Sequence, residues 1–212
     1  MAGSYGKGFT GAGRTLSPVR PLAPFVAAMR ACDPSLEGHA ARVGAHAEAI
    51  ARHLEWPEDR LGALRLGAAL HDVGKVKVSP EVLQKPGRLD PAEVAEIRAH
   101  PLEGARMIAA VPALEAAIPF VLFHHERWDG DGYPTKRAGT KIPLEGRLLA
   151  VADAFDAMTS LRPYRDRLSS DEAAKEVERC AGTQFDPHLA EIFVAAHAAL
   201  EIVTEPAVAL VS

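Results

Sequence analysis

Apolar residues recur along this chain at the spacing of an α-helix. Val43, Ala47, Ile50 and Leu54 follow one another at intervals of four, three and four residues, so they share one helix face. The alternation of apolar and polar positions that marks a half-buried strand is nearly absent. The pattern therefore predicts an all-α fold, a helical bundle.

Prolines that follow capping residues mark several helix starts, because a capping side chain and a proline at the first helical position both favour helix initiation. Three such pairs are Ser79-Pro80, Asp90-Pro91 and Asp186-Pro187. Trp56-Pro57 and His100-Pro101 are interpreted in the same way. Helices are then predicted over residues 36–54, 57–72, 80–84, 91–99, 101–110, 113–127, 143–159, 170–181 and 187–201.

Glycine-rich segments divide the chain. Residues 1–17 contain five glycines among small and polar residues, too little apolar area to offset ordering, which predicts a flexible leader. Residues 18–203 are expected to form one domain, followed by a C-terminal tail at 204–212. Within the domain, residues 128–142 carry three glycines and a proline. They predict a loop long enough to suggest a function.

Composition narrows the class of protein. The 212 residues are 48% hydrophobic and 25% charged, with a formal net charge of -4, which argues against a disordered chain and against a binder of DNA or RNA polymers. Cys32 and Cys180 lie far apart, so neither a disulfide framework nor a thiolate metal site is expected, and a cytoplasmic location fits. No apolar run approaches the roughly 20 residues that cross a bilayer, so no membrane contact is expected.

Several charged residues occur where the pattern predicts burial. His71 and Asp72 end an apolar helix just before Gly74, and a buried aspartate is costly unless it is paired or bound to a cation. Asp153 interrupts the apolar run of residues 149–152, and Asp156 follows one turn later on the same side. Two carboxylates on one helix face repel each other unless a cation neutralises them.

Histidines accompany these acids. His39 continues the apolar stripe one turn before Val43, but His46 lies seven residues later on nearly the same face, so the pattern leaves open which of the two is a half-buried structural histidine. His100 stands at a helix entrance, and His124 and His125 open the segment HHERWDGDGYP. The candidate metal ligands are His39, His71, Asp72, His100, His124, His125 and Asp153.

This candidate set favours more than one metal ion. Imidazole with carboxylate suits iron, manganese, zinc or nickel, and seven ligands are too many for one tetrahedral ion. The natural solution is two ions bridged by Asp72. Two divalent ions at close spacing can lower the pKa of a shared water and clamp the oxygens of a phosphoryl group.

The ordered motifs resemble the HD-GYP domain, a bacterial subfamily of the HD-domain metal-dependent phosphohydrolases. The match runs from about residue 36 to 195, through LHDVGK, LQKPGRL, HPLEGA, HHERWDGDGYP, IPLEGRLLAVADAFDAMTS, RPYR and AGTQFDP. The resemblance implies an HD-domain helical bundle with a long GYP loop. It also implies hydrolysis of cyclic di-GMP to linear pGpG, and in some members onward to GMP, on a centre of two or three metals, often iron or manganese.

The resemblance carries roles to particular residues. The seven candidate ligands occupy the metal-binding positions of the family, and Asp72 and Lys75 are the expected catalytic residues. Lys75 would contact the scissile phosphate or its nucleophile. Substrate contacts are further implied for Tyr133, Asp156, Arg162 and Arg165.

One departure from the family pattern bears on the number of metals. Members with a third metal carry a glutamate one turn before the first histidine, and this place is Ser35 here, with Glu37 two residues later. Two divalent ions, iron or manganese, are therefore predicted. Two alternatives remain open: a weakly active or inactive signalling module that binds nucleotide or a protein partner, and a phosphodiesterase for a hybrid cyclic dinucleotide. A homodimer is also left open.

Overall fold

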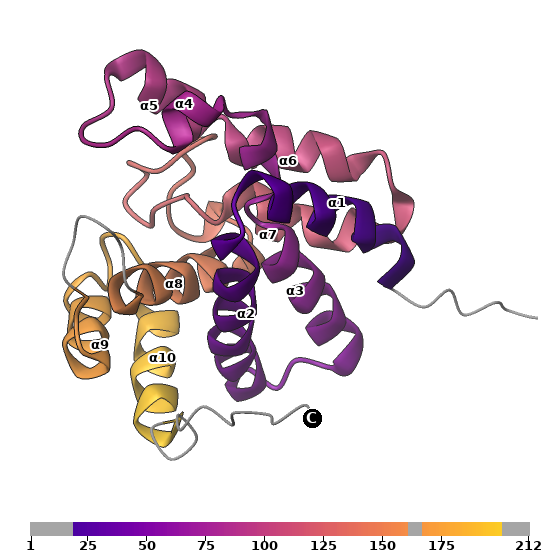
Figure 1. Ribbon diagram of the computed structural model, residues 1–212. Helices are drawn as coiled ribbons and strands as arrows, with labels where there is room; N and C mark the ends of the chain where they lie inside the picture. The colour runs from indigo at the N-terminus through magenta and orange to yellow at the C-terminus, as the bar shows by residue number, and fades with distance from the viewer. Residues whose placement is uncertain (1–18, 161–166, 201–212) are drawn as a thin grey trace, which may run out of the picture.

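The computed structural model of the chain describes residues 19–160 and 167–200 (Figure 1). Within these ranges there is no strand, and Ala181 and Phe185 form an isolated bridge. The predicted all-α fold is confirmed. The predicted leader at 1–17 and tail at 204–212 lie outside the described residues.

Ten α-helices and three 3-10 helices make up the described part of the chain. The α-helices are α1 (Val19–Cys32), α2 (Ser35–His53), α3 (Glu58–Leu70), α4 (Pro80–Leu83), α5 (Pro91–Arg98), α6 (His100–Ala109), α7 (Ile118–Phe123), α8 (Leu144–Thr159), α9 (Ser170–Arg179) and α10 (Pro187–Leu200). The 3-10 helices are η1 (Val73–Lys77), η2 (Pro112–Ala117) and η3 (Gly139–Lys141).

The local signals explain most of these boundaries. Asp90 and Ser169 each form a capping box at the start of α5 and α9, with a glutamate three residues later closing the box. Pro80 and Pro91 stand in the first turn of α4 and α5, as predicted. These helices begin where nearby residues satisfy or remove the free backbone N–H groups of the first turn, so no contact with distant parts of the chain is needed.

Two predictions about helices were wrong. Helix α1 was not predicted, because a proline inside a helix removes a backbone donor and normally signals a break, yet Pro24 lies within α1. The single helix predicted over 113–127 is divided into η2 and α7, with Pro119 in the first turn of α7. Helix α7 ends at Phe123, so His124 and His125 follow the helix rather than lying inside it.

Two hydrophobic clusters hold the helices together. The larger joins α2, α3, α8, α9 and α10 and includes Ile50, Leu64, Leu149 and Phe193. The smaller joins α1, the α3–η1 region, α6 and α7, and includes Ile108. Val43, Ala47 and Ile50 are fully buried, which confirms the stripe on α2.

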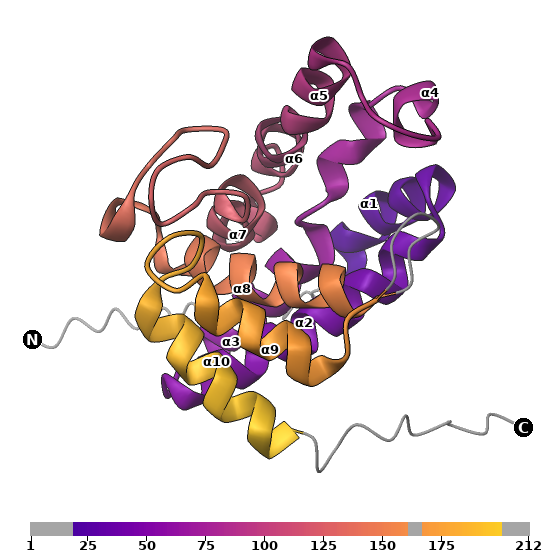
Figure 2. The same cartoon turned by 90° about the vertical axis from the view of Figure 1, so that its left-hand side faces the viewer.

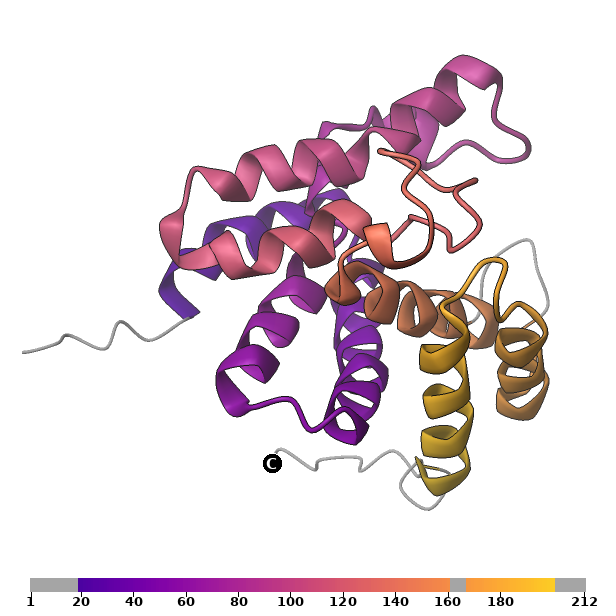
Figure 3. The same ribbon diagram turned by 180° about the vertical axis from the view of Figure 1, so that it is seen from behind.

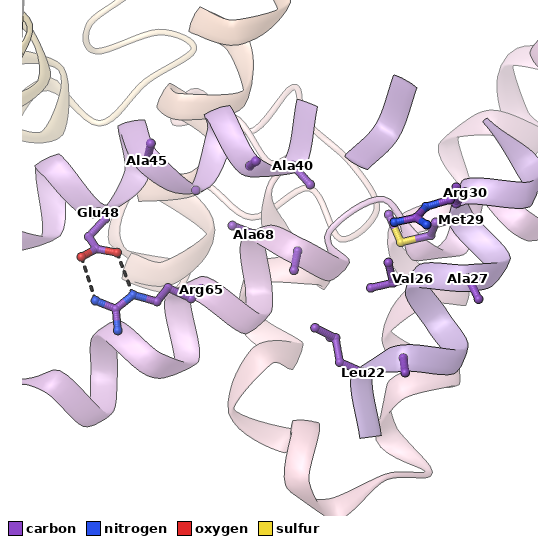
Figure 4. A pocket seen from close by; sticks show the side chains of 14 residues that line it. Leu22, Val26, Ala27, Met29, Arg30, Ala40, Ala45, Glu48, Arg65 and Ala68 are labelled. Carbon is purple, nitrogen blue, oxygen red and sulfur yellow. Dashed lines mark hydrogen bonds and ion pairs between the residues drawn. The ribbon is translucent and has the colours of Figure 1, made fainter. Parts of the chain in front are cut away.

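A long loop lies on one side of the helical bundle and a groove lies on another. Helices α4 and α5 form one end, and the loop of residues 124–143 lies between that end and the helices α8 to α10 (Figures 2 and 3). On another side, a groove of about 800 Å³ runs between α1, α2 and α3 (Figure 4). Leu22, Val26 and Ala68 line this groove, and the ion pair between Glu48 and Arg65, 2.8 Å, lies at one end. None of the candidate metal ligands lines this groove, although His39 belongs to helix α2, which forms part of it.

Candidate metal centre

The motif at the end of α3 brings His71 and Asp72 against α6. Helix α3 ends at Leu70, two residues earlier than predicted, and Asp72 stands at the N-cap position of η1 without a capping hydrogen bond from its side chain. Gly74 then allows a very close approach, because a Cβ there would lie 1.9 Å from the backbone oxygen of His100. As a result His100 Nε2 lies 3.2 Å from Asp72 Oδ1.

Three of the histidines are oriented by the same local hydrogen bond. Nδ1 of His71 lies 2.8 Å from the carbonyl oxygen of Ala68, three residues earlier. Nδ1 of His100 and of His124 make the equivalent bonds to Ile97 at 2.8 Å and to Val121 at 2.9 Å. Because a carbonyl only accepts, these bonds assign the proton to Nδ1 and leave the Nε2 lone pair facing the centre, as a metal ligand requires.

His39 is oriented by a carboxylate instead. Its Nδ1 lies 2.7 Å from Asp156 Oδ2. Arg42 donates from Nε to Asp156 Oδ1 at 2.5 Å and from Nη2 to Oδ2 at 3.1 Å, and Ser160 Oγ donates to Oδ2 at 3.1 Å. Asp156 is 1% exposed and both its oxygens are bonded, so its position does not suit the substrate contact expected from the sequence.

The structure also shows which of His39 and His46 is the structural histidine. His46 packs edge-on against Phe155, with ring centroids 4.9 Å apart, and is the half-buried structural histidine of the pair. His39 points toward the other candidate ligands, with Nε2 3.1 Å from His71 Nε2 and 3.2 Å from Asp153 Oδ1.

The seven candidate ligands meet in two groups. His39, His71 and Asp153 form the first group, and Asp72, His100, His124 and His125 form the second; within each group the ligand atoms lie within 4.8 Å of one another. Asp72 faces both. Its Oδ1 lies near His100, whereas its Oδ2 lies 3.5 Å from His71 Nε2 and 3.8 Å from His39 Nε2. This is the placement that a bridging carboxylate needs.

The protonation states of the candidate ligands favour the binding of cations. Burial raises the pKa of Asp72, but Lys75 and the neighbouring histidines outweigh it and hold that pKa well below its usual range. Burial, followed by the neighbouring histidines, lowers the pKa of His124 well below its usual range and lowers that of His125 to about 3. Neutral imidazoles and ionised carboxylates are the forms that bind metals.

His39 differs from these histidines. Burial lowers its pKa, but hydrogen bonds to Asp153 and Asp156 outweigh burial and raise the pKa to about 9. The carboxylates of Asp153 and Asp156 therefore favour a positive charge at the position of His39. A bound cation satisfies the same preference, so the donor set as a whole fits divalent metal ions.

A hollow of about 600 Å³ opens beside the two groups. Lys75 lies at its edge, with Nζ 2.6 Å from Asp72 Oδ2. Tyr133 stacks on His125, with ring centroids 4.8 Å apart and an angle of 28° between the planes. Arg162 and Arg165, for which substrate contacts were expected, lie outside the described residues.

The loop that carries Tyr133 is tied to the second ligand group. The backbone N–H of Tyr133 donates to the carbonyl of His125 at 3.1 Å, and Thr135 donates from its backbone and its hydroxyl to Glu126 Oε1 at 2.6 and 2.7 Å. Gly132 is required by close packing, since a Cβ there would lie 2.3 Å from the backbone nitrogen of Arg127. The predicted loop is thus ordered against the ligands that precede it.

Sequence reasoning missed three residues around the centre: Arg42, Arg98 and Glu126. Arg42 carries a detectable signal, because it follows His39 by three residues and so shares its helix face. Glu126 stands inside the motif HHERWDGDGYP, but nothing in the sequence indicates its bond to Thr135. Arg98 lines the hollow at the end of α5.

Comparison with protein families agrees with this geometry. A family model described as HD domain matches residues 27–189. The chain belongs to the HD domain family. The resemblance to HD-GYP proteins is also confirmed, since curated relatives of this HD domain carry the name cyclic di-GMP phosphodiesterase.

Three relatives illustrate the range of names. A cyclic di-GMP phosphodiesterase of Thermotoga maritima is 37% identical over 164 residues, covering 76% of this chain and 45% of that protein. A cyclic di-GMP phosphodiesterase of Pseudomonas aeruginosa is 40% identical over 159 residues, covering 74% and 38%. A 3'3'-cGAMP-specific phosphodiesterase of Vibrio cholerae is 34% identical over 158 residues, covering 74% and 30%. The HD domain chain spans less than half the length of each of these relatives.

Solved structures share the fold. The HD domain of the phosphodiesterase PgpH of L. monocytogenes, in complex with cyclic-di-AMP, has a TM-score of 0.61 at 18% identity and covers 86% of this chain and 98% of that one. An HDG"Y"P protein of Bdellovibrio bacteriovorus has a TM-score of 0.61 at 21% identity, covering 76% and 51%. At these identities the likeness concerns the fold. Among the described residues of this HD domain, no helix is long and apolar enough to cross a membrane.

Proposed function

We propose that this HD domain is a metal-dependent phosphodiesterase that hydrolyses cyclic di-GMP to linear pGpG, with GMP as a further product. One observation carries the proposal: two groups of imidazole and carboxylate ligands share Asp72 and lie beside a hollow that holds Lys75 and Tyr133. The names of the relatives support the class of substrate.

The first group of ligands would hold one divalent ion and the second group another, with Asp72 between them. Iron and manganese suit this mixture of imidazole and carboxylate donors. Such a pair, when bound, activates a water for attack on phosphorus and stabilises the charge on the phosphoryl oxygens. Ser35 begins α2 one turn before His39 and offers no carboxylate, which supports two ions rather than three.

The side chains of the hollow would bind and orient the substrate. The Lys75 ammonium lies beside the Asp72 carboxylate and can donate to an oxygen of the scissile phosphate. The Tyr133 ring, held flat on His125, offers an aromatic face for a guanine base. Arg162 and Arg165 remain predicted phosphate contacts. Asp156 would act through His39 rather than on the substrate.

Incubation with the substrate tests the proposal. Protein loaded with ferrous iron under anaerobic conditions, or with manganese, is mixed with cyclic di-GMP, and the products are separated by chromatography while metal content is measured on the same sample. We expect pGpG or GMP, about two metals per chain, and no product from the Asp72→Ala variant. Intact cyclic di-GMP after incubation with fully loaded protein would contradict an enzyme and favour a nucleotide-binding signalling module.

A second substrate is supported by the relatives. Some of them are named 3'3'-cGAMP-specific phosphodiesterases, so the hybrid cyclic dinucleotide belongs in the same assay. A kcat/KM for 3'3'-cGAMP above that for cyclic di-GMP would assign the hybrid as substrate.

The two cysteines are free thiols, Cys180 buried and Cys32 half-buried, which supports a cytoplasmic site of action.

A further inference from the structure

One lysine and two arginines line the hollow, and two of these three residues are bonded to carboxylates. Lys75 lies 2.6 Å from Asp72, and Arg127 donates to both oxygens of Asp129 at 3.0 and 2.6 Å. Arg98 differs: within residues 19–160 and 167–200 no carboxylate pairs with it, and its Cζ instead lies 5.3 Å from the centroid of the Tyr133 ring. Its positive charge is therefore available to a ligand of the hollow.

Arg98 is held at a defined place relative to the metal ligands. It is the last residue of α5, a helix fixed at its start by the capping box of Asp90 and Glu93. The carbonyl of the preceding residue, Ile97, accepts the bond from Nδ1 of His100. The Tyr133 ring is near both Arg98 and His125, with its centroid 5.3 Å from Arg98 Cζ and 4.8 Å from the centroid of the His125 ring. The guanidinium is thus one aromatic ring away from a candidate ligand of the second group.

This spacing matches the chemistry of a cyclic dinucleotide. Such a molecule has two phosphodiesters, separated on each side by one nucleoside. When one phosphodiester lies at the metal centre, the other lies one nucleoside away and keeps its negative charge. Asp131 and Glu176 also line the hollow, and their carboxylates would repel a second phosphodiester unless a cation of the hollow offsets them.

We propose that Arg98 binds the phosphodiester that is not hydrolysed, with the Tyr133 ring supporting the nucleoside between the two phosphates. The proposal rests on the proposed function and adds a subsite to it. A guanidinium suits this place because its planar fork can donate to two phosphate oxygens at once, and because it stays charged at every physiological pH. Arg98 would therefore determine the preference for cyclic dinucleotides over ligands with one phosphate.

Steady-state kinetics of Arg98→Ala and Arg98→Lys test the subsite, with inorganic phosphate as the probe that fills only the metal centre. For Arg98→Ala we expect the KM for cyclic di-GMP to rise about ten- to a hundredfold, the loss typical of a hydrogen bond to a charged group, with kcat within about twofold. The inhibition constant of inorganic phosphate and the metal content should stay at the wild-type values. Arg98→Lys should show a smaller rise in KM, because lysine keeps the charge but not the fork.

Arg137→Ala is the matched control, because Arg137 also lies over an aromatic ring, 4.7 Å from the centroid of Phe123, but does not line the hollow. Its KM should equal that of the wild type. An unchanged KM for Arg98→Ala would overturn the subsite, and so would a parallel rise in the phosphate inhibition constant, since that would place Arg98 at the metal centre. A wild-type protein that hydrolyses no cyclic dinucleotide would overturn the proposed function itself, and the subsite with it.

Discussion

Asp156 is a buried carboxylate that orients a candidate metal ligand without belonging to either ligand group. It accepts hydrogen bonds from Arg42 and lies 2.7 Å from Nδ1 of His39. The contact holds the imidazole with Nε2 toward His71 and Asp153. Partners of this kind fix the ring orientation and raise the basicity of a ligand.

Replacement of Asp156 by asparagine should therefore weaken metal binding selectively. Asparagine keeps the size of the side chain but removes its negative charge, and loss of such a partner typically weakens metal affinity about 10–100-fold. Titration calorimetry with manganese should show the loss at one of two binding steps, namely the ion held by the first ligand group.

Asp129→Asn serves as the control for this prediction. Asp129 also holds an arginine in a two-bond ion pair, but that arginine is Arg127 and neither residue contacts a candidate ligand atom. Its manganese affinity should match the wild type. Equal affinities for wild type and Asp156→Asn would show that His39 needs no support from Asp156.

The ligands could be predicted from the sequence because histidine and aspartate are unusual inside apolar helices, as with Asp153 after residues 149–152. The role of Asp156 could not. Its spacing from Asp153 indicates a shared helix face, but that spacing does not tell which carboxylate lies at Nε2 of His39, among the candidate ligands, and which lies at Nδ1. That choice depends on α2 packing against α8, which is a tertiary contact.

At the scale of elements, the close approach of η1 to α6 determines where Asp72 and His100 meet. Gly74 makes this approach possible, since a Cβ at this position would lie far inside van der Waals contact with the backbone of His100. Gly62, in α3, has no atom within 4 Å of the corresponding position. The two glycines therefore differ in what an added methyl group would do.

Alanine at each of these glycines should change stability in opposite directions. Gly74→Ala should lower the free energy of unfolding by at least the roughly 1–3 kcal/mol typical of overpacking, because backbone rather than a flexible side chain stands in the way. Gly62→Ala should raise the free energy by about 0.5–1 kcal/mol, because alanine is the better helix former. Urea unfolding of both variants measures the difference, and a neutral Gly74→Ala would contradict the close packing of η1 on α6.

Element boundaries were predictable where local chemistry decides them, as at the capping boxes of Asp90 and Ser169. They were not predictable where burial overrides local preference. Helix α1 tolerates Pro24 because its apolar residues, such as Met29, pack into the smaller cluster, and that gain is invisible to a rule about prolines. The division of 113–127 into η2 and α7 does have a local sign, because Pro119 favours a new helix start at this place.

Across the whole molecule, the candidate ligands connect elements far apart in the chain. They come from α2, the end of α3, the start of α6, the end of α7 and α8. Ions that bind this set would join the two hydrophobic clusters, since α2 and α8 belong to the larger and α6 to the smaller. A ligand that binds only the folded state stabilises that state.

Metal addition should accordingly raise the melting temperature. At a free manganese concentration of about 100 times Kd the stabilisation is roughly 2.7 kcal/mol per site, so each occupied site adds about 5–10 °C to the melting temperature of a chain of this length. Asp72→Ala should lose most of this rise, because it removes the bridge. Asp131→Ala should keep it, because Asp131 lines the hollow but belongs to neither ligand group. Scanning calorimetry with and without manganese measures the shift, and equal shifts for the two variants would contradict the bridge.

The stacking of Tyr133 on His125 restricts how this protein can change over evolution. One wall of the hollow is built from His125, a candidate ligand, and the Tyr133 ring that rests on it, so altering that wall would disturb the proposed ion binding as well as the proposed recognition. Arg98, at the end of α5, and Gln184, in the turn after α9, also line the hollow but belong to neither ligand group. New nucleotide preferences would therefore arise at positions such as these, where a substitution leaves every candidate ligand in place.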